Sequence, residues 1–357
     1  GSVGEHNKLE CGSIEKKMGI NASPTCVMHY NDAKGWLVGD LHKGMKAMFI
    51  MMNGARLMVG VQGLGIAEIA YQSALYYANE RLQGRSLNGP KFPDKNADPI
   101  IVHPEIRKNL LKIKTLTEGL RGLMVWTGLQ VDLAQSEVNK FKKQRADDWV
   151  ALMTPILKSF STDVGCEAAN IAVQIYGGHG YIRDHGMEQL LRDVRIAPIY
   201  EGTNGIQALD LMFRKLPLDN GQAMQRLLSD VNKVIDEMKQ DDEELVSMAE
   251  KLEKEVNTLS EITLWLGSKM LEGELVDASA GATPYLKMFG QVLGGYYMGK
   301  AAILANKKFK ETGDEFYKDK ITLSKFYIEQ LLPLASGYAS SITAGKDDLY
   351  AMKAENF

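Results

Sequence analysis

Cysteine is scarce in this sequence of 357 residues. Cys11, Cys26 and Cys166 are too few and too unevenly spaced for a disulfide framework or a zinc site. The six histidines form neither an HxxxH nor an HExxH spacing. The sequence therefore predicts no bound metal and a reducing, cytoplasmic environment.

An excess of positive charge is also lacking. A formal net charge of −3 leaves no basic surface for binding nucleic acid. Polar and charged side chains interrupt the most apolar stretch, from 45 to 70, so we expect no membrane span. No serine lies in a G-x-S-x-G elbow, so no motif supports a hydrolase.

The first forty residues have the pattern of short β-strands. "CGSIEKK", "TCVMHY" and "GWLVGD" are separated by turn-forming residues. Two or three strands make a poor independent sheet. We therefore expect residues 1–42 to be the remnant of a larger β domain that precedes them in a longer protein.

Helical periodicity follows from Gly44 onward. Met45, Met48, Phe49 and Met52 have the spacing of one helix face, in a segment that runs to about residue 84 and is apolar nearly all round. It is predicted to be a central bundle helix, ended by "SLNGPKFPDKNADP". Further helices are predicted at 103–138, 145–176, 187–193 and 204–214. Residues 43–217 would form this helical domain.

The composition changes after "RKLPLDNG". Residues 222–272 are amphipathic and rich in charge, and two more helices are expected at 284–310 and 314–343. The charged runs are interpreted as solvated helix faces, because no heptad pattern is sustained. Residues 218–357 would form a helical C-terminal extension.

Glu201 is the first candidate for chemistry. It lies in "IAPIYEGTNGIQ", after an apolar run and before a glycine-containing turn. Apolar surroundings disfavour the charged form of a carboxyl group, which brings it toward the behaviour of a general base at neutral pH. The alternative is an acid at a helix start that Thr203 or Asn204 caps.

Two further features have both a structural and a functional interpretation. "GGHG" at 177–180 is either a helix C-terminal turn or a ligand loop, and it lacks the spacing of a dinucleotide fingerprint. His179 is interpreted as a loop histidine. Arg56, a cation within apolar sequence, needs either an internal carboxylate or an anionic ligand. Arg81 lies at a helix end, where a cation complements the dipole.

Taken together, three segments resemble the acyl-CoA dehydrogenase family. "IYEGTNGIQ" is similar to the family's catalytic-glutamate segment, "QIYGGHGY" to its flavin-adenine segment, and "KMGINASPT…GDLHKGMKAMFIMMNGAR" to the junction of its β domain and first C-terminal helix. They occur in the family's order over residues 1–216. The resemblance implies a mainly α fold, the family's C-terminal helical bundle, with a short β remnant before it and an extra helical domain after it.

The resemblance implies FAD-dependent α,β-dehydrogenation of an acyl-CoA thioester. Glu201 would abstract the α-proton while a hydride passes to flavin N5, and the Glu201 N–H would help hold the thioester carbonyl. The implied cofactor-binding residues are Arg81, Gln174, Gly177, Gly178, Thr203 and Gln207. The implied substrate-binding residues are Asn53, Arg56, Tyr200 and Gly202. Gln174, Gly177 and Gly178 match positions that contact a neighbouring subunit's FAD.

Some features depart from the family pattern. "RLQG" at 81–84 lacks the family's aromatic residue, and the family's N-terminal helical domain and most of its β domain do not appear. The extension resembles the larger type, such as methylthiopropanoyl-CoA dehydrogenase-like bacterial proteins. Expected partners are an acyl-CoA, an electron-transfer flavoprotein and a second copy of the chain, in a homodimer or homotetramer. The alternatives are an acyl-CoA oxidase and a non-catalytic helical binding protein of the same fold.

Overall fold

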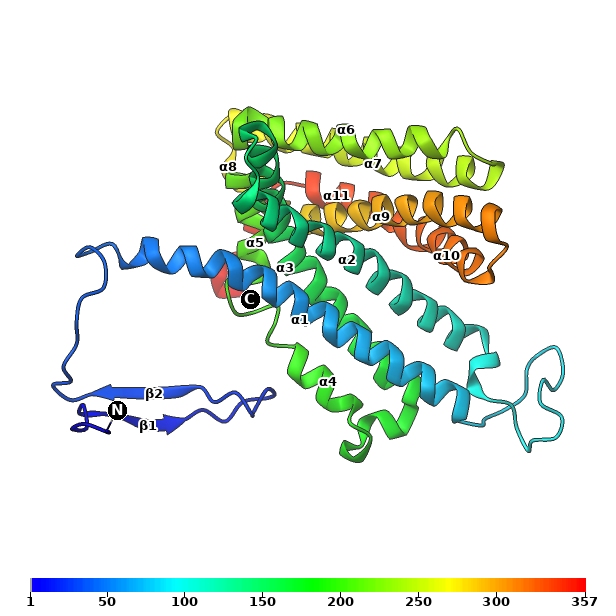
Figure 1. Ribbon diagram of the computed structural model, residues 1–357, viewed down its shortest axis with the longest axis horizontal. Helices are drawn as coiled ribbons and strands as arrows, with labels where there is room; N and C mark the ends of the chain where they lie inside the picture. The colour runs from blue at the N-terminus through cyan, green and yellow to red at the C-terminus, as the bar shows by residue number, and fades with distance from the viewer. Residues whose placement is uncertain (1) are drawn as a thin grey trace.

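A hairpin of two strands precedes a long series of helices in the computed structural model, which describes residues 2–357 (Figure 1). The strands are β1 (Leu9–Ile14) and β2 (Cys26–Tyr30). The first helices are α1 (Gly44–Glu80), α2 (Pro104–Ser136), α3 (Lys140–Tyr176), α4 (Met187–Val194) and α5 (Asn204–Asp210). The extension contains α6 (Gln222–Met238), α7 (Glu243–Leu271), α8 (Leu275–Ala280), α9 (Ala282–Thr312), α10 (Glu315–Phe326), α11 (Ala339–Thr343) and α12 (Asp347–Ala351).

Short turns of 3₁₀ or π helix connect these elements. They are η1 (Ile100–Val102), η2 (Gly177–Tyr181), η3 (Arg183–His185), η4 (Leu211–Lys215), η5 (Leu218–Gly221), η6 (Tyr327–Leu331), η7 (Leu332–Leu334), η8 (Ser336–Tyr338) and η9 (Ala354–Asn356). The predicted mainly α fold is confirmed. The helix predicted at 314–343 is wrong, because Pro333 follows the π turn η6, and its missing N–H prevents a continuous helix.

The strands of the hairpin lie apart from the helical bundle, and the loop between them contacts α4, where Ile20 N donates to Asp193 Oδ1 at 2.5 Å (Figure 1). β1 and β2 pair antiparallel, with Leu9 opposite Tyr30 and Ile14 opposite Cys26. The third predicted strand, "GWLVGD", is wrong: residues 35–40 are irregular and Trp36 is 82% exposed. No strand of residues 2–357 is placed to pair with them, so the run has no ladder to join.

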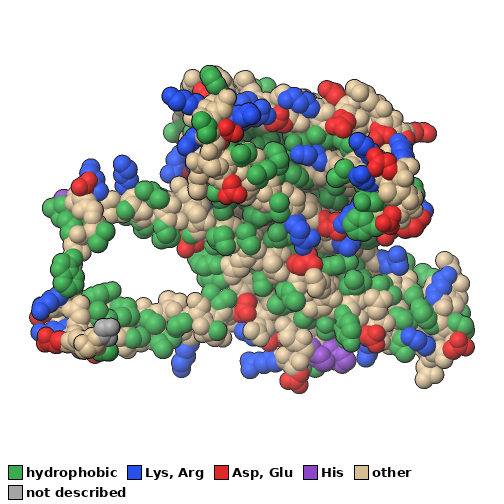
Figure 2. Space-filling model, in the orientation of Figure 1, with side chains coloured by type: hydrophobic (Ala, Val, Ile, Leu, Met, Phe, Trp, Pro, Cys, Tyr) green, Lys and Arg blue, Asp and Glu red, His purple; other side chains and the backbone are tan. Residues whose placement is uncertain are grey.

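Helix α1 is buried along only part of its length. Its later residues, such as Val59, Ala67 and Ala74, pack on α3, whereas Met45 and Phe49 of the predicted buried face are exposed. Figure 2 shows hydrophobic side chains on the surface of the first turns of α1 and of the hairpin. By length and composition α1 could also cross a membrane. The prediction that it is apolar is therefore confirmed, but the prediction that it is central is wrong for its first turns.

Close helix contacts set the position of α1 on α3. A Cβ at Gly63 would lie 2.5 Å from the Ser161 carbonyl oxygen, and a Cβ at Gly165 would lie 2.8 Å from the Gly63 carbonyl oxygen. Only glycine allows the two backbones to approach this closely. The contact joins α1, which carries Asn53 and Arg56, to α3, which carries Gln174.

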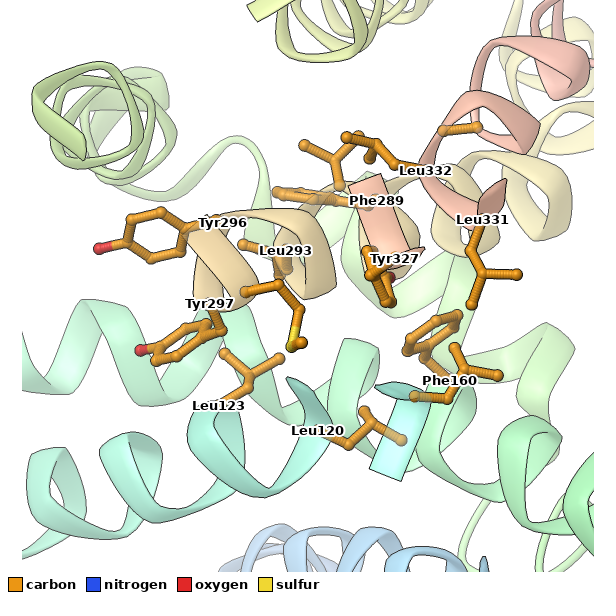
Figure 3. Packing of buried hydrophobic residues seen from close by; sticks show 14 of the residues in the cluster. Leu120, Leu123, Phe160, Phe289, Leu293, Tyr296, Tyr297, Tyr327, Leu331 and Leu332 are labelled. Atoms are coloured by element: carbon orange, nitrogen blue, oxygen red, sulfur yellow. The ribbon is translucent and has the colours of Figure 1, made fainter. Parts of the chain in front are cut away.

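Helix α9 is the centre of the extension and also packs on α2, α3 and α5. Phe289 and Leu293 of α9 belong to the same buried cluster as Leu120 of α2, Phe160 of α3 and Tyr327 (Figure 3). Buried residues of both halves form one hydrophobic cluster. The predicted domain boundary between residues 217 and 218 therefore does not coincide with a break in the hydrophobic core.

Candidate functional site

Glu201 lies in a tight turn between α4 and α5. Glu201 and Gly202 both have left-handed backbone conformations, with φ of 56° and 87°. A residue with a side chain pays about 1–2 kcal/mol for this conformation. The Glu201 carbonyl accepts hydrogen bonds from Arg56 Nε at 3.2 Å and Gln207 Nε2 at 3.3 Å, and these contacts hold the turn.

The remaining polar groups of Glu201 are free to act on another molecule. Within residues 2–357 its carboxylate accepts no hydrogen bond and forms no ion pair, and its N–H donates to no protein acceptor. The side chain is half-buried. A strained turn thus presents a carboxylate and an N–H that the rest of the fold does not use.

Arg56 lies behind this turn and is buried. Its NH1 atom lies 3.5 Å from Oδ2 of Asp210 on α5, and Arg214 pairs with the other carboxylate oxygen at 2.5 Å. The prediction of an internal carboxylate partner for Arg56 is confirmed. Arg56 therefore connects α1 to α5 and to the Glu201 turn. Asp210 was not predicted, because nothing in "QALDLMF" marks its side chain as buried.

The neighbouring predicted residues surround the same turn. Thr203 Oγ1 accepts from Ile206 N at 3.3 Å, so the prediction that Thr203 caps the next helix is confirmed. The Tyr200 hydroxyl donates to Gln62 of α1, and burial raises the pKa of Tyr200, with a further rise from the nearby charge of Glu201. Asn53 is exposed on α1, one helical turn before Arg56.

Gln207 is fully buried beneath the turn. Its Nε2 also donates to the Gly202 carbonyl at 3.2 Å, and its Oε1 has no partner within residues 2–357. An added Cβ at Gly202 would lie 2.9 Å from Gln207 Nε2. The positive φ and this contact both require glycine after Glu201.

A polar cluster that the sequence did not reveal anchors the start of α5. Lys158 of α3 is fully buried, and its Nζ donates to Asn204 Oδ1 at 2.9 Å. Burial lowers the pKa of Lys158 to about 8. The sequence feature that could have predicted this burial is the same as for Arg56: Lys158 is the one charged residue in the run "TPILKSF".

A second group of predicted residues lines a cavity at the C-terminal ends of α1 and α3. The cavity has a volume of about 580 Å³ and is lined in part by Arg81, Gln174, Gly177 and Gly178. Gly177 has φ 59° and caps α3, so this segment is a helix C-terminal turn. The same turn also exposes its backbone to the cavity.

Aromatic side chains form one wall of this cavity. The rings of Tyr77 and Tyr176 are stacked with centroids 4.0 Å apart, and the Tyr77 hydroxyl lies 2.9 Å from His179 Nδ1. Arg81 is exposed and pairs with no carboxylate of residues 2–357. A cation, open glycine backbone and flat rings together suit a ligand that carries both an anion and an aromatic ring.

The two groups of residues lie far apart. Arg56 and Glu80 are 24 residues apart on one continuous helix, α1, which corresponds to roughly 36 Å. The structure therefore brings Asn53, Arg56, Tyr200, Gly202, Thr203 and Gln207 together around Glu201. It places Arg81, Gln174, Gly177 and Gly178 at the other end of the bundle.

Two family models match the sequence. Residues 42–216 match "Acyl-CoA dehydrogenase, C-terminal domain", and residues 227–353 match "Acetyl-CoA dehydrogenase C-terminal like". The sequence is 38% identical to 3-methylmercaptopropionyl-CoA dehydrogenase of Ruegeria pomeroyi, and 30% identical to the broad-specificity linear acyl-CoA dehydrogenase FadE5 of Mycobacterium tuberculosis. Each match covers 98% of this chain and 59% of the relative, so the chain spans about three fifths of their length.

Solved structures show the same fold. Caenorhabditis elegans ACDH-11 in complex with C11-CoA matches 98% of this chain and 55% of that chain, with a TM-score of 0.78 and 19% identity. A Bacillus anthracis acyl-CoA dehydrogenase complexed with FAD matches 97% of this chain and 57% of that chain, with a TM-score of 0.68 and 24% identity. The hairpin, the bundle and the extension thus form an arrangement found in other proteins.

Proposed function

Because the chain belongs to the acyl-CoA dehydrogenase family, we propose that it provides the catalytic base and part of the flavin site for α,β-dehydrogenation of an acyl-CoA thioester. The observation that carries this proposal is the Glu201 turn. Its carboxylate and its N–H have no partner within residues 2–357, although Arg56 and Gln207 hold the turn rigidly.

The carboxylate of Glu201 is the base in this proposal. It removes a proton from the carbon next to the thioester carbonyl, which leaves negative charge on the carbonyl oxygen. The free N–H of Glu201 donates to that oxygen and stabilises the charge. Base and donor belong to one residue, so the left-handed turn sets the geometry of both.

The residues present fit FAD, which when bound accepts the hydride from the β-carbon. At the 580 Å³ cavity, the free cation Arg81 suits a pyrophosphate and the backbone of Gly177 and Gly178 is open to it. Near Glu201, the buried Gln207 Oε1 lacks a donor, and Thr203 is exposed beside it. These groups would hold the cofactor at two places.

The distance between these places supports the proposal of a homo-oligomer. Roughly 36 Å along α1 is longer than one extended FAD molecule, so one cofactor cannot reach both groups within one chain. We propose that the Arg81 cavity holds the adenine half of a flavin whose ring lies at the Glu201 turn of a second copy. A homodimer and a homotetramer both allow this arrangement.

The proposed substrate is an acyl-CoA, and the proposed setting is the cytoplasm. The solved complex of ACDH-11 contains an acyl-CoA, and the relatives are named as dehydrogenases of such thioesters. An electron-transfer flavoprotein is the proposed electron acceptor. Tyr200 precedes Glu201 in the turn, and Asn53 is exposed on α1 one helical turn before Arg56; both are proposed to contact the substrate, with Arg56 supporting the turn from behind.

The test is a visible absorption spectrum of the purified protein with FAD, recorded before and after adding an acyl-CoA. We expect the flavin to bleach with wild-type protein, and to bleach about 10²–10⁴-fold more slowly with Glu201→Gln. Glu188→Gln, on the neighbouring helix α4, is the control and should bleach normally. Equal rates for Glu201→Gln and wild type would contradict the assignment. Oxygen uptake without an added acceptor would indicate an oxidase.

A further inference from the structure

Lys158 is a buried cation that the proposed reaction has not yet used. It lies in the middle of α3, and its side chain has no exposed surface. No carboxylate of residues 2–357 lies within ion-pair distance of its Nζ, whose one hydrogen-bond acceptor is Asn204 Oδ1 at 2.9 Å. Lysine is almost never fully buried without a charged partner. The fold alone gives no reason for a charge here.

Asn204 connects this lysine to the Glu201 turn. Its N–H donates to the Pro198 carbonyl at 3.0 Å, which closes the turn that contains Glu201. Its Nδ2 donates to Asp163 Oδ1 at 2.8 Å and to Thr162 Oγ1 at 3.1 Å, both on α3. The base of the turn is therefore attached to α3 through one asparagine, whose acceptor oxygen is held by Lys158.

The charges around Lys158 come from several elements. Burial lowers its pKa to about 8, the negative charges of Asp163 and Glu201 act in the opposite direction, and the positive charge of Arg56 adds to the lowering. Lys158 is therefore an ammonium at neutral pH. Lys287 of α9 lies 3.9 Å from Asp163, and Asp210 of α5 pairs with Arg56. Arg56 and Lys287 each have a carboxylate partner, whereas Lys158 has none in contact with it among residues 2–357.

We infer that Lys158 is a positioning residue for Glu201: through Asn204 it holds the catalytic turn against α3, and its ammonium group adds positive potential near the Glu201 carboxylate. This inference rests on the proposed function. Lys158 does not touch the substrate. A cation in a low-dielectric interior acts on a nearby carboxylate over several ångströms, because little water screens the interaction.

Two variants separate the hydrogen bond of Lys158 from its charge. Lys158→Met removes the hydrogen bond and the charge together, whereas Lys158→Gln keeps an amide donor without the charge. Lys287→Met is the matched control, because it removes a lysine charge near Asp163 but does not touch Asn204. Asn204→Ala breaks the same link from the other side, and it replaces Lys158→Met if that variant does not fold.

The first measurement is the rate of flavin bleaching by an acyl-CoA, using the FAD-loaded protein. Lys158→Met is expected to bleach roughly tenfold to a hundredfold more slowly at neutral pH, because a small misplacement of a base is costly. Lys158→Gln should recover part of the rate, because its amide can still donate to Asn204. Lys287→Met should bleach at the wild-type rate.

The second measurement does not depend on activity. Hydrogen exchange of the amides of residues 199–206 should become faster in Lys158→Met and Asn204→Ala, and should stay as in wild type in Lys287→Met. Folded Lys158 variants with wild-type bleaching rates and unchanged exchange would overturn the inference. If the wild-type protein with FAD does not bleach at all, the proposed function fails, and the exchange result still decides whether Lys158 holds the turn.

Discussion

The two halves of this molecule have different interiors. Around the Glu201 turn, the interior contains the charged side chains of Arg56, Lys158 and Asp210. In the extension, the interior is mainly aliphatic and aromatic, with Phe289 and Tyr327 among its largest fully buried side chains. One continuous hydrophobic cluster joins the halves, so they differ in the chemistry of their buried polar groups and not in how well they are packed.

Three buried polar groups of the extension form hydrogen bonds with the main chain. Gln291 Nε2 donates to the Leu331 carbonyl, the Tyr327 hydroxyl donates to the Gln291 carbonyl, and Glu255 accepts from Ser336 N. They satisfy a backbone that the π turn and Pro333 interrupt. The charges near Glu201 instead hold a strained turn. Buried polar groups at a helix break thus have a structural role. Buried charges that form no hydrogen bond with an interrupted helix instead indicate a functional site.

The largest expected effect is in the extension. Phe289→Ala removes a fully buried ring, so the free energy of unfolding should fall by about 3–5 kcal/mol. Flavin bleaching per folded molecule should stay at the wild-type value. Urea unfolding and bleaching rates measure the two, with Leu304→Ala as an exposed control on the same helix. A slower reaction in folded Phe289→Ala would mean that the extension also shapes the site.

The next effect is at the buried ion pair. Arg56→Met leaves Asp210 buried with only Arg214 beside it, so the free energy of unfolding should fall by about 3 kcal/mol. The double variant Arg56→Met/Asp210→Leu should regain most of this loss, because an apolar pair of similar size avoids the cost of burying charge. Urea unfolding tests both. A double variant as unstable as the single one would show that the Glu201 turn, and not Asp210, needs the arginine.

The smallest effect concerns the contact between α1 and α3. A Cβ at Gly63 would lie 2.5 Å from the Ser161 carbonyl, so Gly63→Ala should lower the free energy of unfolding by about 1–3 kcal/mol. Gly54 of the same helix has no atom within 4 Å of its Cβ position, so Gly54→Ala should raise stability by about 0.5–1 kcal/mol. The thermal unfolding midpoints of the two variants test this prediction. Equal changes in midpoint would mean that α1 and α3 move apart at Gly63 with little loss of stability.

Sequence periodicity predicted most helices, because each long apolar stripe must pack against something. It could not show which partner covers a stripe, so the exposed first turns of α1 were predicted to be buried. The family resemblance implied separate site roles for Glu201, Arg56 and Gln207, and the structure brings the three residues together. Lys158 and Asp210 were missed, because burial of a polar side chain within a helix depends on the facing helix, which the local sequence does not describe.

The position of α9 has a consequence for protein synthesis. α9 packs on α2, α3 and α5, yet it follows all of them in the chain. When a ribosome has completed α1–α5, the surfaces that α9 will cover, including Leu120 and Phe160, are still exposed to the cell. Such surfaces make a growing chain prone to aggregation. We therefore expect the half that contains Glu201 to depend on chaperones until α9 has left the ribosome.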